Sequence, residues 1–247
     1  MHPFRTVFAN EIVAEFLPPA RKSRKVMILL GGMPTVPAKR EMLVHFSKRG
    51  YWTFFPRYRG SWESGGRFLR ISPERDVLDL VGQLPRGFKD MWSRVRHRIV
   101  PSVIHIIASS FGGPAGILAS RDPRVSKVVA LSPVVDWRAP SAEEPLGRLY
   151  TFVKEAFGGG YRVSRPAWDK LERGMFYNPA AHVSELNGRK LFIIHASDDR
   201  IVRPGPVIRF AKKTGASFLL LPRGGHLGSR TLFRPSVHKR MIHFFRT

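Results

Sequence analysis

One serine of the sequence stands in a short run of small residues between two apolar segments. The run is residues 108–113 (ASSFGG), and the apolar segment before it is 103–107 (VIHII). A strand, a tight turn and a helix in this order would place Ser110 at the apex of the turn, in strained backbone geometry where side chains two residues away must be small. Ala108 and Gly112 meet that need. Ser110 is therefore a candidate nucleophile, although a serine in such a loop is more often structural.

A serine hydroxyl is a weak nucleophile and needs a base, which in turn needs an acid to orient it. Asp198 and Asp199 follow the apolar segment 191–194, and His226 follows the next one, 217–221. The interval from Asp199 to His226 fits one strand–loop–helix–strand step. Each residue also has a structural interpretation, Asp199 as a cap of a nearby helix and His226 as an ordinary loop residue. Their order along the chain, Ser, Asp and His, favours a catalytic triad.

Short apolar, β-branched runs bounded by turn residues predict the strands that would position these side chains. The predicted strands are 11–16, 26–30, 53–55, 103–107, 128–131, 191–194 and 217–221. Continuous apolar runs are typical of strands that are buried on both faces of a parallel sheet. Helical patterns lie between them: one over 38–48, one opened by Ser72 as N-cap and Pro73, one from Pro204 to before Gly215, and one from Pro235.

Alternation of strands and helices over the whole chain predicts an α/β protein with a doubly wound, mostly parallel sheet. Ligand sites of such sheets lie at the carboxyl ends of the strands, which is where Ser110, Asp199 and His226 all fall. Residues 138–189 are too long for a simple crossover and rich in aromatic residues. We expect a single domain over 1–247, with 138–189 as a helical lid inserted into it.

Composition narrows the function classes further. The chain of 247 residues has 42 Lys and Arg against 18 Asp and Glu, a formal charge of +24, and no Cys. Disulfides, thiolate metal sites and a cysteine nucleophile are therefore excluded. No run approaches the ~20 apolar residues of a spanning helix, so we expect a cytoplasmic protein. The positive charge allows binding of nucleic acid or another polyanion, but an evenly solvated basic surface is the favoured interpretation, because no nucleic-acid-binding signature is present.

The chain resembles α/β-hydrolases over nearly its full length. Residues 29–34 (LLGGMP) are similar to the oxyanion loop of that family, and 55–60 with 64–66 to its Arg-Gly and Ser-Gly loop. Residues 131–137 (LSPVVDW) are similar to prolyl-oligopeptidase-type catalytic domains and related esterases. The family's acid comes four residues after a His, which the resemblance carries to His195 and therefore selects Asp199 over Asp198.

Four positions depart from the family's pattern. Gly31 stands where many members have His, Ala108 replaces the first Gly of the nucleophile turn, and Ala196 replaces a Gly. The two exchanges of Gly for Ala, at 108 and 196, are sterically mild. Arg57 stands where an Asp is frequent, which puts in doubt the polar contact that this Asp makes.

The resemblance implies acyl transfer by Ser110, His226 and Asp199, with no metal or organic cofactor. The backbone N–H groups of Phe111 and Met33 are the expected oxyanion donors, with Gly32 in reserve, since Pro34 has no N–H. We expect an esterase acting on a small-molecule ester. A peptidase or amidase of the prolyl-oligopeptidase type is the alternative, but the ~25 residues before the strand at 26–30 are too few for a propeller blade of ~40. A second alternative is a non-catalytic, basic binding module on a hydrolase scaffold.

Overall fold

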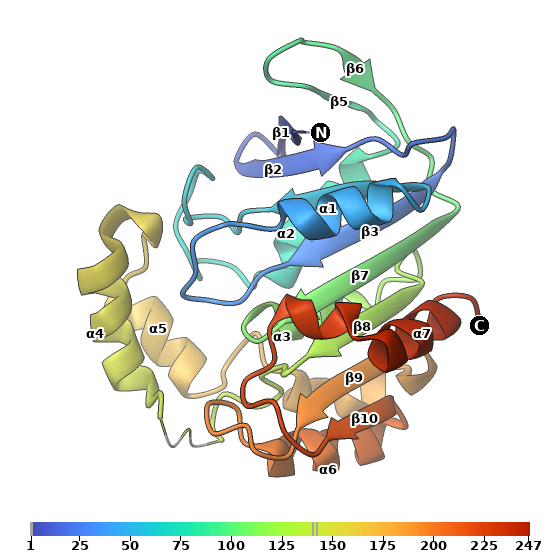
Figure 1. Ribbon diagram of the computed structural model, residues 1–247. Helices are drawn as coiled ribbons and strands as arrows, with labels where there is room; N and C mark the ends of the chain where they lie inside the picture. Colours follow the sequence, from blue (N-terminus) through green and yellow to red (C-terminus); the bar gives the residue numbers. More distant parts are fainter. Residues whose placement is uncertain (1, 140, 142) are drawn as a thin grey trace.

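The computed structural model describes residues 2–139, 141 and 143–247, and this part of the chain is built around an eight-stranded sheet (Figure 1). The strand order is β1-β2-β4-β3-β7-β8-β9-β10. The strands are β1 Phe4–Phe8, β2 Ile12–Leu17, β3 Lys25–Leu30, β4 Tyr51–Pro56, β7 Val103–Ser109, β8 Lys127–Leu131, β9 Leu191–Ala196 and β10 Ser217–Leu221. The strands from β4 to β10 in this order pair in parallel. Strand β2 is antiparallel to both of its neighbours, β1 and β4. The mostly parallel α/β architecture predicted from the sequence is confirmed.

Helices cover both faces of the sheet, as a doubly wound fold requires (Figure 1). The helices are α1 Arg40–Ser47, α2 Glu74–Gln83, α3 Gly112–Ala119, α4 Leu146–Phe157, α5 Arg165–Glu172, α6 Pro204–Thr214 and α7 Pro235–Phe244. The apolar sides of α1 and α7 pack in one buried cluster, and those of α2, α3 and α6 pack in the other. The sheet is thus buried on both faces, which explains the continuous apolar runs of its central strands.

The predicted helix over 38–48 is α1, which begins two residues later and ends one residue earlier. Helix α6 begins at Pro204 and ends at Thr214, because Gly215 adopts the left-handed conformation (φ +69°). The predicted N-cap Ser72 is wrong. Pro73 occupies the N-cap position of α2 without a side-chain cap, and the Ser72 hydroxyl donates instead to the Glu74 carboxylate.

The edge of the sheet holds strands that the sequence did not reveal. Strand β1 pairs with β2 through a turn in which Ala9 and Asn10 have positive φ. Arg5 and Thr6 interrupt its apolar residues, so β1 lacks the continuous apolar run by which the other strands are found. A second small sheet, β5 (Phe88–Lys89) with β6 (Arg96–His97), forms a hairpin that was also not predicted.

Residues 138–189, predicted as a lid, hold α4, α5 and the short 3-10 segments η1 (Gly158–Gly160), η2 (Pro179–Glu185) and η3 (Gly188–Lys190). Residues 140 and 142 of this range lie outside the described residues. In Figure 1, α4 and α5 lie beside the carboxyl ends of the parallel strands. Single β-bridges join Ser61 to Tyr161 and Phe68 to Val163, and they tie this segment to the loops that follow β4.

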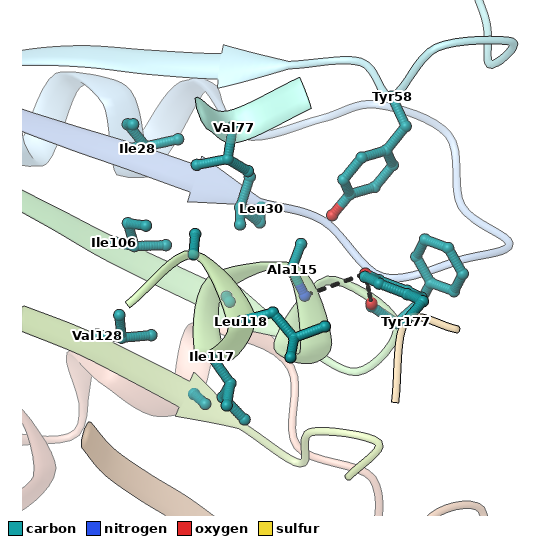
Figure 2. Close-up of a cluster of buried hydrophobic side chains, with 14 of the residues drawn as sticks. Ile28, Leu30, Tyr58, Val77, Ile106, Ala115, Ile117, Leu118, Val128 and Tyr177 are labelled. Atoms are coloured by element: carbon teal, nitrogen blue, oxygen red, sulfur yellow. Dashed lines mark hydrogen bonds between the residues drawn. The ribbon is translucent and has the colours of Figure 1, made fainter. Parts of the chain in front are cut away.

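Helix α3 packs directly on the central strands and is held at its start by a tyrosine. Figure 2 shows Ala115, Ile117 and Leu118 of α3 beside Ile106 and Val128 of the central strands, with Tyr177 next to Ala115. The Tyr177 hydroxyl accepts a hydrogen bond from Ala115 N (3.2 Å) and donates to Phe111 O. In a regular α-helix the N–H of Ala115 would bond directly to the carbonyl of Phe111, four residues earlier. The hydroxyl instead bridges these two buried groups and gives each of them a partner.

We predict that Tyr177→Phe lowers the free energy of unfolding by about 1–3 kcal/mol, because a buried N–H and a buried carbonyl each lose a partner while the ring stays in place. Urea unfolding followed by circular dichroism measures this loss. Tyr150→Phe, at a half-buried ring that packs on Trp168, is the control and should change stability little. Equal effects of the two variants would contradict the role assigned to the Tyr177 hydroxyl.

Candidate active site

Ser110 lies in the turn between the end of β7 and the start of α3. Its φ is +51°, a left-handed backbone conformation that costs a residue with a Cβ roughly 1–2 kcal/mol. Two backbone hydrogen bonds hold the turn: Ser110 N donates to Leu131 O on β8, and Gly113 N donates to Ser110 O, both at 2.9 Å. The turn is therefore strained locally but fixed to the neighbouring strand. Backbone strain of this kind is concentrated at functional sites.

Gly112 and Gly113 must lack side chains because atoms of other segments lie against them. A Cβ on Gly112 would come within 2.6 Å of Gly31 O and 2.7 Å of the Tyr58 hydroxyl. A Cβ on Gly113 would come within 2.4 Å of the Pro133 Cβ. The small residue expected at 112 from the turn geometry is thus needed for the close approach of β3 and α3.

Asp199 follows β9 and is only 3% exposed. One carboxylate oxygen accepts hydrogen bonds from Ile201 N and Val202 N, both at 3.0 Å, and the other accepts one from His226 Nδ1 at 2.9 Å. Burial acts to raise the pKa of this carboxyl, but the hydrogen bond and charge of His226 and the N–H of Val202 outweigh it and hold the pKa below its usual value. Asp199 is therefore ionised near neutral pH and fixes the proton of His226 on Nδ1, which leaves Nε2 as the basic nitrogen.

Asp198, the other acid of this loop, makes different contacts. Its carboxylate accepts hydrogen bonds from Gly225 N (2.8 Å) and Gly224 N (3.2 Å), in the loop just before His226. These two N–H groups, that of Gly225 first, hold its pKa below the usual range. The adjacent acids thus bind the same loop at two points: Asp198 holds its backbone, and Asp199 holds the imidazole.

Two further residues of this network were not among the candidates. Ser132 follows β8, has a φ of +39°, and its hydroxyl accepts a hydrogen bond from Leu227 N (3.1 Å) while it also contacts the Asp199 carboxylate. His195 is fully buried, and its Nε2 lies 2.8 Å from Val202 O and 3.4 Å from the Asp199 carboxylate. Burial lowers the His195 pKa, so the ring is neutral at neutral pH. The segment 131–137, which carried part of the family resemblance, was the only signal for Ser132.

The Asp–His pair is linked to the serine turn through β8. Ser110 N bonds to Leu131, the last residue of β8, and Leu227 N bonds to the hydroxyl of the next residue, Ser132. Leu227, which follows the candidate base, and Ser110, the candidate nucleophile, are therefore anchored to two consecutive residues of the chain. The structure brings Asp199 and His226 into direct contact and places Ser110 at the same edge of the sheet.

The loop after β3 lies against the serine turn. A Cβ built on Gly32 would lie 3.2 Å from the Ser110 Cβ and 3.7 Å from its hydroxyl oxygen. Met33, the next residue, lines a cavity together with Ser110 and Phe111. The Tyr58 hydroxyl donates to Gly31 O (3.1 Å) and so holds the loop in place. The N–H groups expected to stabilise an oxyanion thus belong to residues on two sides of the serine.

The cavity beside Ser110 is mostly apolar. It encloses about 670 Å³ of empty space, counting its open mouth. Val134, Val135, Trp137, Leu146, Leu149 and Val207 are among the apolar side chains that line it. Glu144 also lines it, and burial raises the pKa of its carboxyl, against the effect of the nearby His226. The cavity therefore suits an apolar group attached to a polar reacting centre.

Arg57, which replaces a frequent Asp of the resembled family, has its own set of partners. Its guanidinium pairs with Glu15 (3.1 Å) and Glu63 (3.3 Å), donates to Phe55 O (3.0 Å) and lies over the Phe55 ring. The side chain is buried but fully used in these contacts. The partners of Arg57 thus lie in β2, in β4 and in the loop after β4, and none of these contacts involves Asp199 or His226.

Within the described part of the chain, no three His, Asp or Glu side chains are grouped so that they could hold a metal ion. The helices described there are also all too short or too polar to cross a membrane.

We predict that Gly112→Ala destabilises the protein by about 1–3 kcal/mol and lowers its activity, because the new methyl group must displace backbone next to Ser110. Thermal unfolding and an esterase assay measure the two effects. Gly159→Ala is the matched control, since a Cβ there meets nothing within 4 Å. A fully stable and active Gly112→Ala protein would contradict the tight packing of this turn.

We predict that Asp199→Asn is less stable than the wild type at pH 6 by about 1–3 kcal/mol, because a charge-assisted hydrogen bond is lost. The folded-state pKa of Asp199 lies below its ordinary 3.8. The unfolded chain therefore binds the proton first as the pH falls, so the contribution of Asp199 is complete above about pH 5 and is lost as the pH falls through the folded pKa.

The difference in the free energy of unfolding between the wild type and Asp199→Asn should therefore shrink below pH 4. Urea unfolding between pH 3 and pH 6 tests this. Asp198→Asn serves as the neighbouring control for activity, which should fall much further in Asp199→Asn. The reverse order of activities would assign the orienting role to Asp198.

No protein-family model matches the chain, and no curated protein matches its sequence. The structure does match solved structures. It is similar to the Pyrococcus furiosus esterase Pf2001, with a TM-score of 0.70, 17% identity, and coverage of 99% of this chain and 90% of the esterase. It is similar to the acylaminoacyl peptidase of Pyrococcus horikoshii, with a TM-score of 0.66, 17% identity and 99% coverage, although it spans only 41% of the peptidase.

A third similar structure is the alpha/beta hydrolase GrgF from Penicillium sp. sh18, with a TM-score of 0.70, 14% identity, and coverage of 98% of this chain and 96% of the other. At these identities the likeness concerns the fold. The sheet order, the helices on both faces and these three matches agree, and the chain has the α/β-hydrolase fold.

Proposed function

We propose that this protein is a serine hydrolase that cleaves carboxylic esters through an acyl-enzyme intermediate. The observation that carries the proposal is the 2.9 Å hydrogen bond between His226 Nδ1 and the buried Asp199 carboxylate, at the sheet edge where Ser110 is held at positive φ. Asp199 orients the imidazole and stabilises its protonated form, so that Nε2 acts as the general base.

In the proposed reaction, Ser110 Oγ attacks the ester carbonyl while His226 Nε2 takes the hydroxyl proton. The N–H groups of Phe111 and Met33 stabilise the tetrahedral oxyanion, and His226 then protonates the departing alcohol. Water repeats the sequence on the acyl-enzyme and releases the acid. The preference for an ester over a peptide rests on the apolar lining of the cavity beside Ser110.

The segment 138–189 is the proposed lid of this site within a single domain. Leu146 and Leu149 of α4 line the cavity together with Ser110, which supports this assignment. Arg162 reinforces the attachment of the segment to the main domain, because its guanidinium donates to Trp62 O (3.0 Å) and to Ser64 O in the loop after β4.

We predict that Ser110→Ala abolishes turnover of p-nitrophenyl acetate, by a factor on the order of 10⁴ or more, and labelling by a fluorophosphonate, with the fold preserved. Ser109→Ala is the matched control, because it removes the neighbouring hydroxyl and should leave labelling intact. Wild-type turnover by Ser110→Ala would remove Ser110 from the mechanism. No labelling of the wild type, together with salt-sensitive retention on heparin, would favour a basic binding module.

A peptidase or amidase is the second candidate, favoured by the similarity of the fold to an acylaminoacyl peptidase. Esters of graded chain length, assayed beside aminoacyl and peptidyl anilides, distinguish the two. A higher kcat/KM for the anilides would replace the esterase proposal by the peptidase.

A further inference from the structure

The hairpin of β5 and β6 stands clear of the main sheet. In Figure 1 it projects beyond the edge formed by β1 and β2, as a separate two-stranded ribbon. Its base is firmly attached, because the Phe88 ring packs against Phe8, Phe16 and Phe54 at centroid distances of 5.3–5.5 Å. We call residues 88–100 the basic hairpin.

The tip of the basic hairpin exposes large apolar side chains. Trp92 is 94% exposed, and Met91 and Val95 in the same turn are each about half exposed. Val100, which follows β6 at the base of the hairpin, is also about half exposed. An exposed apolar group of this size on an otherwise strongly charged surface marks an interaction site. Nothing in the described chain packs over Trp92, although the hairpin base lies in the core.

This exposed tip is built by specific hydrogen bonds. The buried Asp90 carboxylate accepts from Ser93 N (2.8 Å) and Trp92 N (3.3 Å), and Met91 N donates to Arg5 O on β1 (2.7 Å). Arg94 has a positive φ of +62°, which closes the turn. The backbone that carries Trp92 is therefore held in one conformation before any partner binds, which lowers the entropy cost of docking.

The flanks of the tip carry only positive charge. Lys89, Arg94, Arg96 and Arg98 are exposed, and the single acid of residues 88–100 is the buried Asp90. Arg96 donates to the Arg86 carbonyl (3.1 Å) and Arg98 to the Pro85 carbonyl (2.7 Å), so the described contacts of these guanidinium groups leave their charges unneutralised.

We propose that the basic hairpin docks this protein on the surface of an anionic lipid bilayer, with Trp92 and Met91 entering the headgroup region. A bilayer interface supplies both complements at once: anionic headgroups for the four cations and an apolar boundary for the tip, where Trp is the favoured residue. A nucleic acid would match the cations and stack on Trp92, but it gives no apolar surroundings to Met91, Val95 and Val100.

The test is co-sedimentation with vesicles of phosphatidylglycerol mixed with phosphatidylcholine, and with phosphatidylcholine alone. Binding is expected on the anionic vesicles and should weaken about tenfold or more in Met91→Ser/Trp92→Ser, and similarly in Arg94→Gln/Arg98→Gln. The matched controls are Met175→Ser, at an exposed methionine between α5 and η2, and Lys212→Gln/Lys213→Gln, at exposed lysines of α6. Both should bind like the wild type.

A second measurement reports on Trp92 itself. Quenching of tryptophan fluorescence by brominated acyl chains should occur in the wild type on anionic vesicles and disappear in Trp92→Phe. The proposal is overturned if wild-type protein stays in solution with anionic vesicles, if the hairpin and control variants bind alike, or if Trp92→Ser weakens binding to a single-stranded oligonucleotide and not to vesicles.

Discussion

A buried carboxylate needs a donor for each of its oxygens, and the candidate site is organised around this need at Asp199. The donors come from its own loop (Ile201 N and Val202 N) and from the imidazole of His226, with the Ser132 hydroxyl also in contact. Together these donors offset the cost of burying an ionised carboxylate, which would be several kcal/mol if the group were left unpaired. The ionised Asp199 thereby fixes both the position and the proton of His226.

The protein has few acidic residues, and their positions determine where its positive charge is neutralised. Of the 18 acidic residues, all of which the structure describes, only Glu41, Glu63, Glu143, Glu155, Glu185 and Asp198 are exposed. Several of the others accept hydrogen bonds from backbone N–H groups, as Asp90 and Asp199 do, and some pair with a partly exposed arginine, as Asp169 does with Arg165. These acids are therefore held by local donors. A net charge of +24 is therefore compatible with the fold, because most of the excess positive charge is on side chains that are exposed to solvent.

The sequence predicted the features that depend on strong local patterns. The central strands are apolar throughout because both faces are covered, and Ser110, Asp199 and His226 each follow such a strand, so their common edge could be inferred. Strand β1 could not be predicted, because it is a short edge strand whose apolar residues are interrupted by Arg5 and Thr6. The roles of Asp198 and Ser132 could not be inferred either, since their partners, Gly224, Gly225 and Leu227, are backbone groups whose direction depends on the folded loop.

The geometry of a parallel sheet explains how three separate loops, those after β7, β8 and β9, are aligned at this edge. Hydrogen bonds between parallel strands slant, so the residue just beyond one strand can donate to the last residues of the next. Ser110 N donates in this way to Leu131 O, Ser132 N to Ile194 O, and Ser197 N to Leu221 O. Each loop is thereby fixed to the end of the following strand, in the order β7, β8, β9 and β10. The positive φ of Ser110 and of Ser132 can persist because these bonds hold the strained residues in place, whereas an isolated turn would relax.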